Sequence, residues 1–138
     1  MSEWAPAGHF SPIGNRGWWP RRGDKARYDQ QPMEATALLL AAEAALEVTG
    51  DPRHRATIEW TYGWFLGHND GGLPVALPDR GACQDGLLPS GVNANQGAES
   101  TLMWLQAVER VRASRRSSAL TEQVLAPSWS IVAEAASA

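Results

Sequence analysis

The chain has 138 residues, of which 43% are hydrophobic and 20% charged, and its formal net charge is −3. This length supports one domain with a single core, and the composition excludes an intrinsically disordered chain. The negative charge argues against nucleic-acid binding as a property of the whole chain. The single cysteine, Cys83, excludes an internal disulfide and a cysteine metal cluster.

Hydropathy sets an expectation about location. The longest uninterrupted apolar run, residues 37–42, is far shorter than the ~20 residues of a membrane-spanning helix. The first residues show neither the basic nor the apolar region of a secretory signal peptide. We therefore expect a cytoplasmic protein without a membrane span.

Residues 1–31 predict an irregular segment that is basic and aromatic. Seven glycines and prolines fall within it, too many for a helix. Residues 15–28 contain five basic residues against the single acid Asp24, a local charge of +4; the basic residues are Arg16, Arg21, Arg22, Lys25 and Arg27. Such a cluster either clamps an anionic group or forms a solvated basic loop.

A helical hairpin is expected next, with helices at about 32–49 and 52–67. Pro32 suits a first helical position, where its missing N–H costs nothing. Gly50 is a typical helix stop, and Asp51 is a good N-cap for the second helix. The short connection makes the two helices antiparallel neighbours.

Repeated glycines and prolines then predict a loop over 69–95, a length that is usually functional or disordered. Helical spacing of apolar residues returns over 96–113, and 114–138 reads as a weakly structured tail. The expected organisation is thus an N-terminal segment 1–31, a helical core 32–113 and the tail.

One sequence segment is echoed 65 residues downstream. Gln31-Pro32-Met33-Glu34-Ala35-Thr36 matches Gln96-Gly97-Ala98-Glu99-Ser100-Thr101 at Gln, Glu and Thr. Coincidence and a repeated-hairpin array both account for this match. The array would make the first and third helices equivalent and would place two glutamates at matching helix starts.

Tryptophan is unusually frequent, with seven residues. Trp60, Trp64 and Trp104 fall on the expected helices and are predicted to pack in the core. Trp18 and Trp19 lie in the irregular segment, where an exposed indole offers a flat stacking surface. These two are the candidate platform for a ligand.

Carboxylates and amides gather in the loops and at the helix starts. The carboxylates are Asp29, Glu34, Asp70, Asp85 and Glu99. The amides among them include Gln30, Asn95 and Gln96. Aromatic faces cover the C–H side of a pyranose and such polar groups bind its hydroxyls, so the mixture favours a sugar ligand. Helix capping is the alternative role for each polar group.

Other chemistries are not indicated. The three histidines are scattered, so we expect no metal site and no cofactor. Cys83 and Ser90 lack the local signature of a covalent nucleophile. The catalytic residues, if the chain is an enzyme, stay unassigned.

Several motifs resemble a bacterial six-hairpin, (α/α) toroid domain of the glycosidase-like kind that is associated with or fused to retaining two-Rossmann glycosyltransferases. The motifs are Asp29-Gln30-Gln31-Pro32-Met33-Glu34, Gln84-Asp85-Gly86-Leu87 and Asn93-Ala94-Asn95-Gln96-Gly97-Ala98-Glu99-Ser100-Thr101. By this resemblance the chain is the C-terminal part of such a toroid. The residues that would then line the ligand funnel are Asp29, Gln30, Glu34, Asp85, Asn95, Gln96 and Glu99.

The expected fold is therefore all-α, a partial toroid of one helical hairpin and a third helix with long polar loops. The expected function is carbohydrate binding or processing linked to glycan synthesis, with Trp18 and Trp19 added to the funnel residues. The alternatives are a sugar epimerase or glycosidase-like enzyme, and a non-catalytic helical module that completes a toroid with a partner chain. The expected partners are a sugar or polysaccharide, and a glycosyltransferase or the rest of the toroid.

Overall fold

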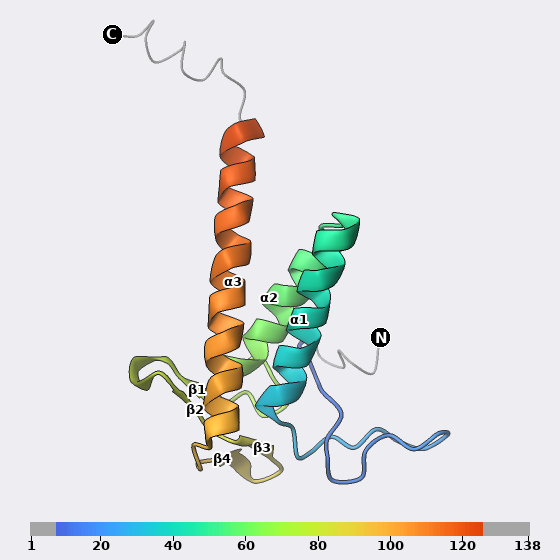
Figure 1. Cartoon of the computed structure of the whole chain (residues 1–138). Coiled ribbons are helices and arrows are strands. Elements are labelled where there is room, and N and C mark those ends of the chain that lie inside the picture. Colours follow the sequence, from blue (N-terminus) through green and yellow to red (C-terminus); the bar gives the residue numbers. More distant parts are fainter. Residues whose placement is uncertain (1–7, 126–138) are drawn as a thin grey trace, which may run out of the picture.

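The computed structural model of the chain describes residues 8–125. Within them, three helices make up most of the structure: α1 (Pro32–Thr49), α2 (Arg53–Phe65) and α3 (Ala98–Leu125). α1 and α2 form an antiparallel hairpin, and α3 packs along both (Figure 1). α1 and α3 begin at the same end of the molecule and run in the same direction. The chain is a small, mostly helical domain.

The helical hairpin follows from local signals in its sequence. The backbone N–H of Gln31 donates to Glu34 Oε2 at 2.8 Å, which closes the first turn of α1. Gly50 ends α1 with a φ of 68°, and its N–H donates to the Leu46 carbonyl at 2.8 Å. Asp51 then accepts the backbone N–H of Arg53 at 2.9 Å, so α2 begins at once. The helix bounds lie close to those expected.

α3 is longer than the sequence indicated. It continues to Leu125, so the weakly structured tail predicted from residue 114 is wrong over 114–125. The reason is that neither glycine nor proline interrupts the chain between Ala98 and Ala126. Glu59 of α2 also holds the distal part of α3 through Arg115, at 2.6 and 2.8 Å. The remaining tail, 126–138, and residues 1–7 lie outside the described part.

Two small β-hairpins occupy the expected loop, so the all-α prediction is wrong there. β1 (Ala76–Leu77) pairs antiparallel with β2 (Ala82–Cys83) across the short helix η1 (Pro78–Arg80). β3 (Gly86–Leu88) pairs antiparallel with β4 (Gly91–Asn93). Strands of two or three residues are too short to show an alternating pattern, which is why the sequence did not reveal them.

The core lies between the three helices and is rich in aromatic rings. Trp64 and Trp104 are buried, which confirms their predicted packing role. The Phe65 and Trp104 rings have centroids 5.3 Å apart. Trp60 is partly buried; it contacts Phe10 with centroids 5.1 Å apart and donates its indole N–H to the Gly8 carbonyl at 3.1 Å. These contacts attach the N-terminal segment to α2.

A short bridge brings the starts of α1 and α3 together. Gln30, just before α1, forms an isolated antiparallel bridge with Leu87 of β3, with N···O distances of 3.0 and 2.9 Å. Gly86 lies so close to the Gln30 carbonyl that a Cβ there would approach it to 2.2 Å. Only glycine fits this contact and its φ of 146°. Within residues 8–125, none of the helices has the length and apolar character needed to cross a bilayer.

Candidate functional site

Asp85 organises the start of α3. Its Oδ1 accepts the backbone N–H of Gly97 at 2.7 Å and the hydroxyl of Ser100 at 2.8 Å. The side-chain amide of Asn95 donates to Oδ2. The hydrogen bond from Asn95 lowers the pKa of Asp85, burial opposes this, and the bonds from Gly97 and Ser100 lower the pKa further. Asp85 therefore caps α3 as an ionised carboxylate, which is the capping role left open by the sequence.

The other predicted residues at this helix start face solvent. Asn95, Gln96 and Glu99 are all exposed. Gln96 and Glu99 make no side-chain hydrogen bond or ion pair with any residue in 8–125. The polar groups of these two side chains are therefore available to an external ligand. They are not needed to cap α3, because Asp85 already does so.

Asp29 lies just before α1, and only one of its two carboxylate oxygens has a hydrogen-bond donor. Its Oδ2 accepts a hydrogen bond from the Arg16 guanidinium at 3.2 Å. Its Oδ1 is buried and has no hydrogen-bond partner within the described part of the chain. An unpaired buried acceptor costs about 1–3 kcal/mol, so this oxygen needs a donor from outside these residues. The Arg16 side chain that donates to Oδ2 is 68% exposed.

Glu34 lies at the edge of an apolar pocket. The pocket has a volume of ≈ 310 Å³ and is lined by Phe10, Pro12, Ile13, Glu34, Ala37 and Leu38. Burial raises the pKa of Glu34, and the hydrogen bond from the Gln31 backbone N–H partly opposes that rise. Glu34 thus combines a capping role with a carboxyl group that is easier to protonate than usual.

Gln30 does not line an accessible surface, in contrast to the expectation from resemblance. Its side chain is fully buried. Its amide donates to the Arg27 carbonyl at 2.8 Å and to Asp70, and its oxygen accepts the Trp64 indole N–H at 2.8 Å. All of its polar atoms are therefore used inside the protein. Gln30 holds the segment before α1 in place, and it presents no group to a ligand.

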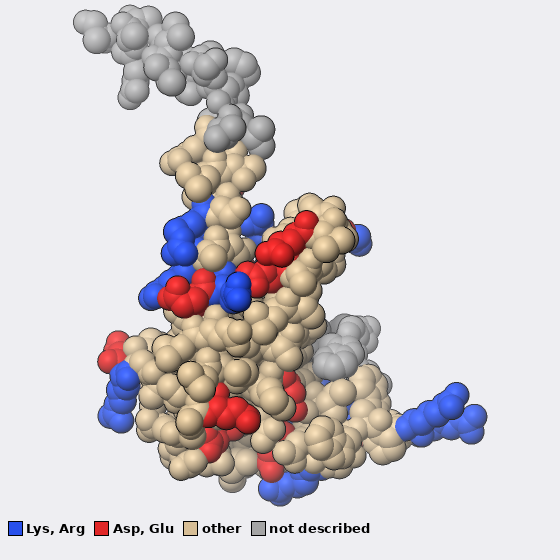
Figure 2. All heavy atoms as spheres, viewed as in Figure 1, with Lys and Arg blue, Asp and Glu red and all other residues tan. Residues whose placement is uncertain are grey.

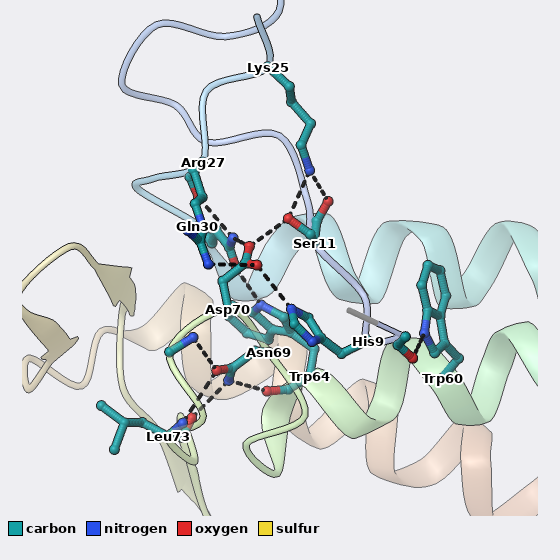
Figure 3. Close-up of polar contacts among 12 residues, drawn as sticks. His9, Ser11, Lys25, Arg27, Gln30, Trp60, Trp64, Asn69, Asp70 and Leu73 are labelled. Atoms are coloured by element: carbon teal, nitrogen blue, oxygen red, sulfur yellow. Dashed lines mark hydrogen bonds and ion pairs between the residues drawn. The ribbon is translucent and has the colours of Figure 1, made fainter. Parts of the chain in front are cut away.

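The densest polar cluster is centred on Asp70, whose side chain is 1% exposed. Figure 3 shows side chains from two separate segments of the chain converging on this carboxylate. His9 Nε2 lies 2.9 Å from Oδ1, and the Ser11 hydroxyl donates to Oδ2 at 2.5 Å. Gln30 donates to Oδ2, and the Arg27 guanidinium lies 3.5 Å from Oδ1. We call these five residues the Asp70 network.

The electrostatics of the Asp70 network favour an ionised carboxylate. Burial raises the pKa of Asp70, but the hydrogen bonds from Ser11, His9 and Gln30 and the charge of Arg27 outweigh it, so the pKa lies below its ordinary value. Beside the network, Lys25 Nζ donates to Ser11 Oγ at 2.8 Å.

The sequence shows Asp70 as one more loop acid, because its partners lie 40 to 61 residues away. The neighbouring Asn69 orders this turn: it is buried, and its amide donates to the Trp64 and Leu73 carbonyls at 2.8 Å.

Trp18 and Trp19 stand on a loop that projects from the body of the molecule. Trp18 is 64% exposed and has a φ of 58°, in the left-handed region. Trp19 is 37% exposed. The two indoles therefore offer accessible aromatic surface, as a stacking platform requires. The loop is joined to the start of α1, since Asn15 donates its backbone N–H to the Asp29 carbonyl at 2.9 Å.

Two observations bear on covalent and metal chemistry. Burial, together with the charge of Asp85, raises the pKa of Cys83 to about 12, so its thiol is not a ready nucleophile. No group of three or more metal-ligating side chains occurs within residues 8–125. What the two helix starts present instead is a set of amide, carboxylate and aromatic groups suited to binding hydroxyl groups.

Comparison of the chain with protein-family models and with curated proteins gives no match. The proposals below therefore depend on the geometry of this chain and on the resemblance of its motifs.

Proposed function

We propose that this chain binds carbohydrate at the surface where α1 and α3 begin, as part of a protein that takes part in glycan synthesis. The observation that carries the proposal is the joining of the two helix starts by the Gln30–Leu87 bridge. This bridge places Asp29 on the same end of the molecule as Asn95, Gln96 and Glu99. Figure 2 shows acidic side chains grouped over that end.

The chemistry of these groups suits sugar hydroxyls. A hydroxyl can donate to a carboxylate and accept from an amide, so paired amides and carboxylates bind vicinal hydroxyls. Asp29 Oδ1 lacks a donor among residues 8–125, and a ligand hydroxyl would supply one while Arg16 stays on Oδ2. Trp18 adds an aromatic face for the apolar side of the ring. Asp85 contributes by fixing the position of Asn95.

The arrangement of the helices supports a place for the chain in an (α/α) toroid. In such a fold the inner helices of successive hairpins run parallel, and α1 and α3 do so here, while α2, which lies between them in the sequence, is antiparallel to both. The echoed positions Ala35 and Ser100 are both buried. The hydroxyl of Thr36, another echoed residue, donates to the Met103 carbonyl of α3 at 3.0 Å. We therefore propose that α1 and α3 are equivalent inner helices of a partial toroid.

Glycan binding tests the proposal directly. A glycan array would identify ligands for the wild-type chain, and calorimetry would then compare Glu99→Gln and Trp18→Ala. Each variant should bind about tenfold more weakly, the effect of losing one charged hydrogen bond or one stacking surface, with an unchanged melting temperature. Matched controls are Glu122→Gln and Leu120→Ala, at exposed positions on the distal part of α3. Absence of glycan binding, or equal binding by all variants, would overturn the proposal.

A second function is favoured by one specific observation on α1. Besides its buried face, α1 carries an exposed apolar stripe at helical spacing, formed by Met33, Ala37, Ala41, Ala44 and Val48. An apolar face of a helix is normally covered by a packing partner. The stripe therefore suits a neighbouring helix, in a module that completes a toroid by association with further copies of the chain.

Solution size tests this second function. Light scattering coupled to size-exclusion chromatography should show oligomers at high protein concentration. Ala41→Glu should dissociate them, because a charge at the centre of an apolar helix contact is costly. Ala119→Glu, on the exposed distal part of α3, is the matched control. A monomer at every concentration would contradict self-association through α1.

A further inference from the structure

Residues 14–28 form a projecting arm whose two sides are joined by backbone hydrogen bonds. Gly14 donates to the Ala26 carbonyl at 2.6 Å, and Ala26 donates to the Trp18 carbonyl at 2.7 Å. Arg16 donates to the Tyr28 carbonyl at 3.1 Å. Figure 1 shows this segment extending away from the helices. The arm therefore has a defined shape although it contains no regular strand.

The tip of the arm is a tight turn that presents two arginines. Gly23 donates its backbone N–H to the Pro20 carbonyl at 2.9 Å, which closes a four-residue turn. Arg21 and Arg22 are the two central residues of that turn and both are exposed. Arg22 has a φ of 68°, the conformation that a type II turn needs at this position and that glycine usually supplies.

Backbone strain is concentrated in this arm. In residues 8–125 the non-glycine residues with positive φ are Trp18 and Arg22. Glycine would adopt either conformation at lower cost, since bulky residues are rarely found there. Each of these positions instead holds a large, exposed side chain. Strained positions of this kind cluster at ligand-binding sites, where the side chain matters more than the strain it causes.

Two of the arm's four arginines form ion pairs within the described part of the chain, and the other two do not. Arg16 pairs with Asp29 at 3.2 Å and Arg27 with Asp70 at 3.5 Å. Arg21 and Arg22 make no ion pair with any residue that the structure describes. Figure 2 shows basic side chains at the tip of the arm, apart from the acidic groups of the body. Two guanidinium groups are thus free to receive an anion.

We propose that the arm selects carbohydrate polymers that carry carboxylate groups, with Arg21 and Arg22 binding the carboxylates and Trp18 stacking on a sugar ring. This inference rests on the proposed function and names the class of its ligand. Arginine suits the task because its planar group binds a carboxylate through two parallel hydrogen bonds. The neighbouring Trp18 adds the surface that distinguishes a sugar acid from a simple anion.

The position of the arm favours a polymer over a single sugar. The base of the arm is bonded to the start of α1, because Asn15 and Arg16 both contact Asp29. Arg21 lies six residues after Asn15, a reach of at most about 20 Å at the rise of an extended chain. Since the arm extends away from the helices (Figure 1), the tip and the helix start are placed to contact separate residues of one chain of sugars.

The polymer need not be repelled by the acids at the helix starts. Asp29 is paired with Arg16, and Asp85 is held by donors at the positive end of α3. Glu34 accepts the backbone N–H of Gln31 at 2.8 Å. Of the acids predicted to line the site, Glu99 alone has no bonded partner within residues 8–125, and it lies in the first turn of α3, while the arm extends away from the helices.

The experiment compares matched acidic and neutral polymers. The probes are polygalacturonate, alginate and hyaluronan, each beside its methyl ester, with vesicles of anionic phospholipid as a separate arm. Binding to the wild-type chain is measured by calorimetry at low and at physiological salt. The variants are Arg21→Gln/Arg22→Gln, Arg22→Gly and Trp18→Ala. The charge-matched control is Arg80→Gln/Arg116→Gln, which removes two exposed arginines far from the arm.

At least one acidic polymer should bind about tenfold more tightly than its ester, as expected for two arginine–carboxylate contacts at a protein surface. This preference should weaken as salt screens the charges, and it should vanish in the arginine variants but not in the control. Arg22→Gly should lower acid binding while the melting temperature stays equal or rises, a result that a purely structural role for Arg22 would not produce. Trp18→Ala should weaken binding of the acid and the ester alike.

The results separate a failure of the carboxylate selection from a failure of the carbohydrate function. If esters and acids bind equally and the arginine variants change nothing, the selection for carboxylates is wrong and the carbohydrate function stands. If no polymer binds, the inference is overturned, and the glycan array decides separately whether the carbohydrate function stands. If only vesicles bind, the arm is a lipid-surface contact and the inference is overturned.

Discussion

Asp70 and Asp85 are both carboxylates that accept several hydrogen bonds, but their donors lie at very different distances along the chain. Each carboxylate accepts several hydrogen bonds, and each has a pKa below its ordinary value. The donors to Asp85 lie 10 to 15 residues away, at the start of one helix. The side-chain donors to Asp70 lie 40 to 61 residues away, on two other segments. One acid caps an element, and the other holds separate parts of the chain together.

This difference predicts unequal consequences when the acids are removed. A capping residue that faces solvent can be replaced in part by water, so its loss is modest. A buried carboxylate that satisfies several donors leaves all of them unpaired when it is lost. The free energy of unfolding therefore depends strongly on the central residue of a buried polar network.

The largest effect is expected for Asp70→Asn. The asparagine keeps the size of the side chain but loses the charge, and an NH2 group replaces one acceptor oxygen. Either Ser11 and Gln30 at Oδ2 or His9 and Arg27 at Oδ1 then lose their acceptor. We expect the free energy of unfolding to fall by about 3 kcal/mol. Urea denaturation followed by circular dichroism would measure it, with the exposed Asp79→Asn as control. A loss below about 1 kcal/mol would show that the network does not stabilise the fold.

A smaller effect is expected for Asp85→Ala. Removing the cap leaves the Gly97 backbone N–H and the Ser100 hydroxyl without their acceptor. The free energy of unfolding should fall by about 1–2 kcal/mol, the usual cost of losing an N-cap. The same urea titration measures it. A loss equal to that of Asp70→Asn would remove the distinction between the two regions.

The effect of Asp85→Ala should also depend on pH. Because the pKa of Asp85 is lowered in the folded state, its stabilisation is fully present above the ordinary aspartate value of 3.8. It is lost as the pH falls through the lower folded-state pKa. Unfolding curves of the wild type and the variant should therefore converge at acid pH. A constant difference between them down to the lowest pH would contradict an ionised cap.

The smallest effect is expected for Glu34→Gln. Burial raises the pKa of Glu34, so its ionised form disfavours folding as the pH rises above its ordinary value of 4.5. Glutamine keeps the hydrogen bond from the Gln31 backbone without the charge. Stability at pH 7 should stay equal or rise by at most about 0.5 kcal/mol. A loss above about 1 kcal/mol would mean that the charge of Glu34 is itself stabilising.

The helices were largely predictable because their signals are local. Pro32 and Gly50 mark the ends of α1 by their own backbone preferences, and those preferences act whatever the rest of the chain does. The end of α3 was not predictable, because residues 114–125 are largely polar and contain neither a glycine nor a proline that would mark a stop. The strands were not predictable because each has only two or three residues, too few for an alternating hydrophobic pattern. They form through hydrogen bonds to a partner strand.

The candidate site was predictable in its residue types but not in their roles. Asp85, Asn95 and Glu99 could be singled out because they surround a helix start. Gln30 belongs to the same motif, yet its burial against Trp64 and Asp70 makes it a structural residue. The free arginines at the tip of the arm could not be told from the paired ones, because pairing depends on which acids the fold brings near.

By itself, the sequence determined the composition that permits one domain, the positions where helices start, and the aromatic and basic character of residues 14–28. These properties reside in single residues or in neighbours along the chain. The tertiary structure decided which polar groups face solvent and which are used internally, and it joined the starts of α1 and α3 through β3. Such outcomes depend on contacts between distant residues, and burial and hydrogen bonding then separate Asp70 from Asp85 although both are aspartates in loops.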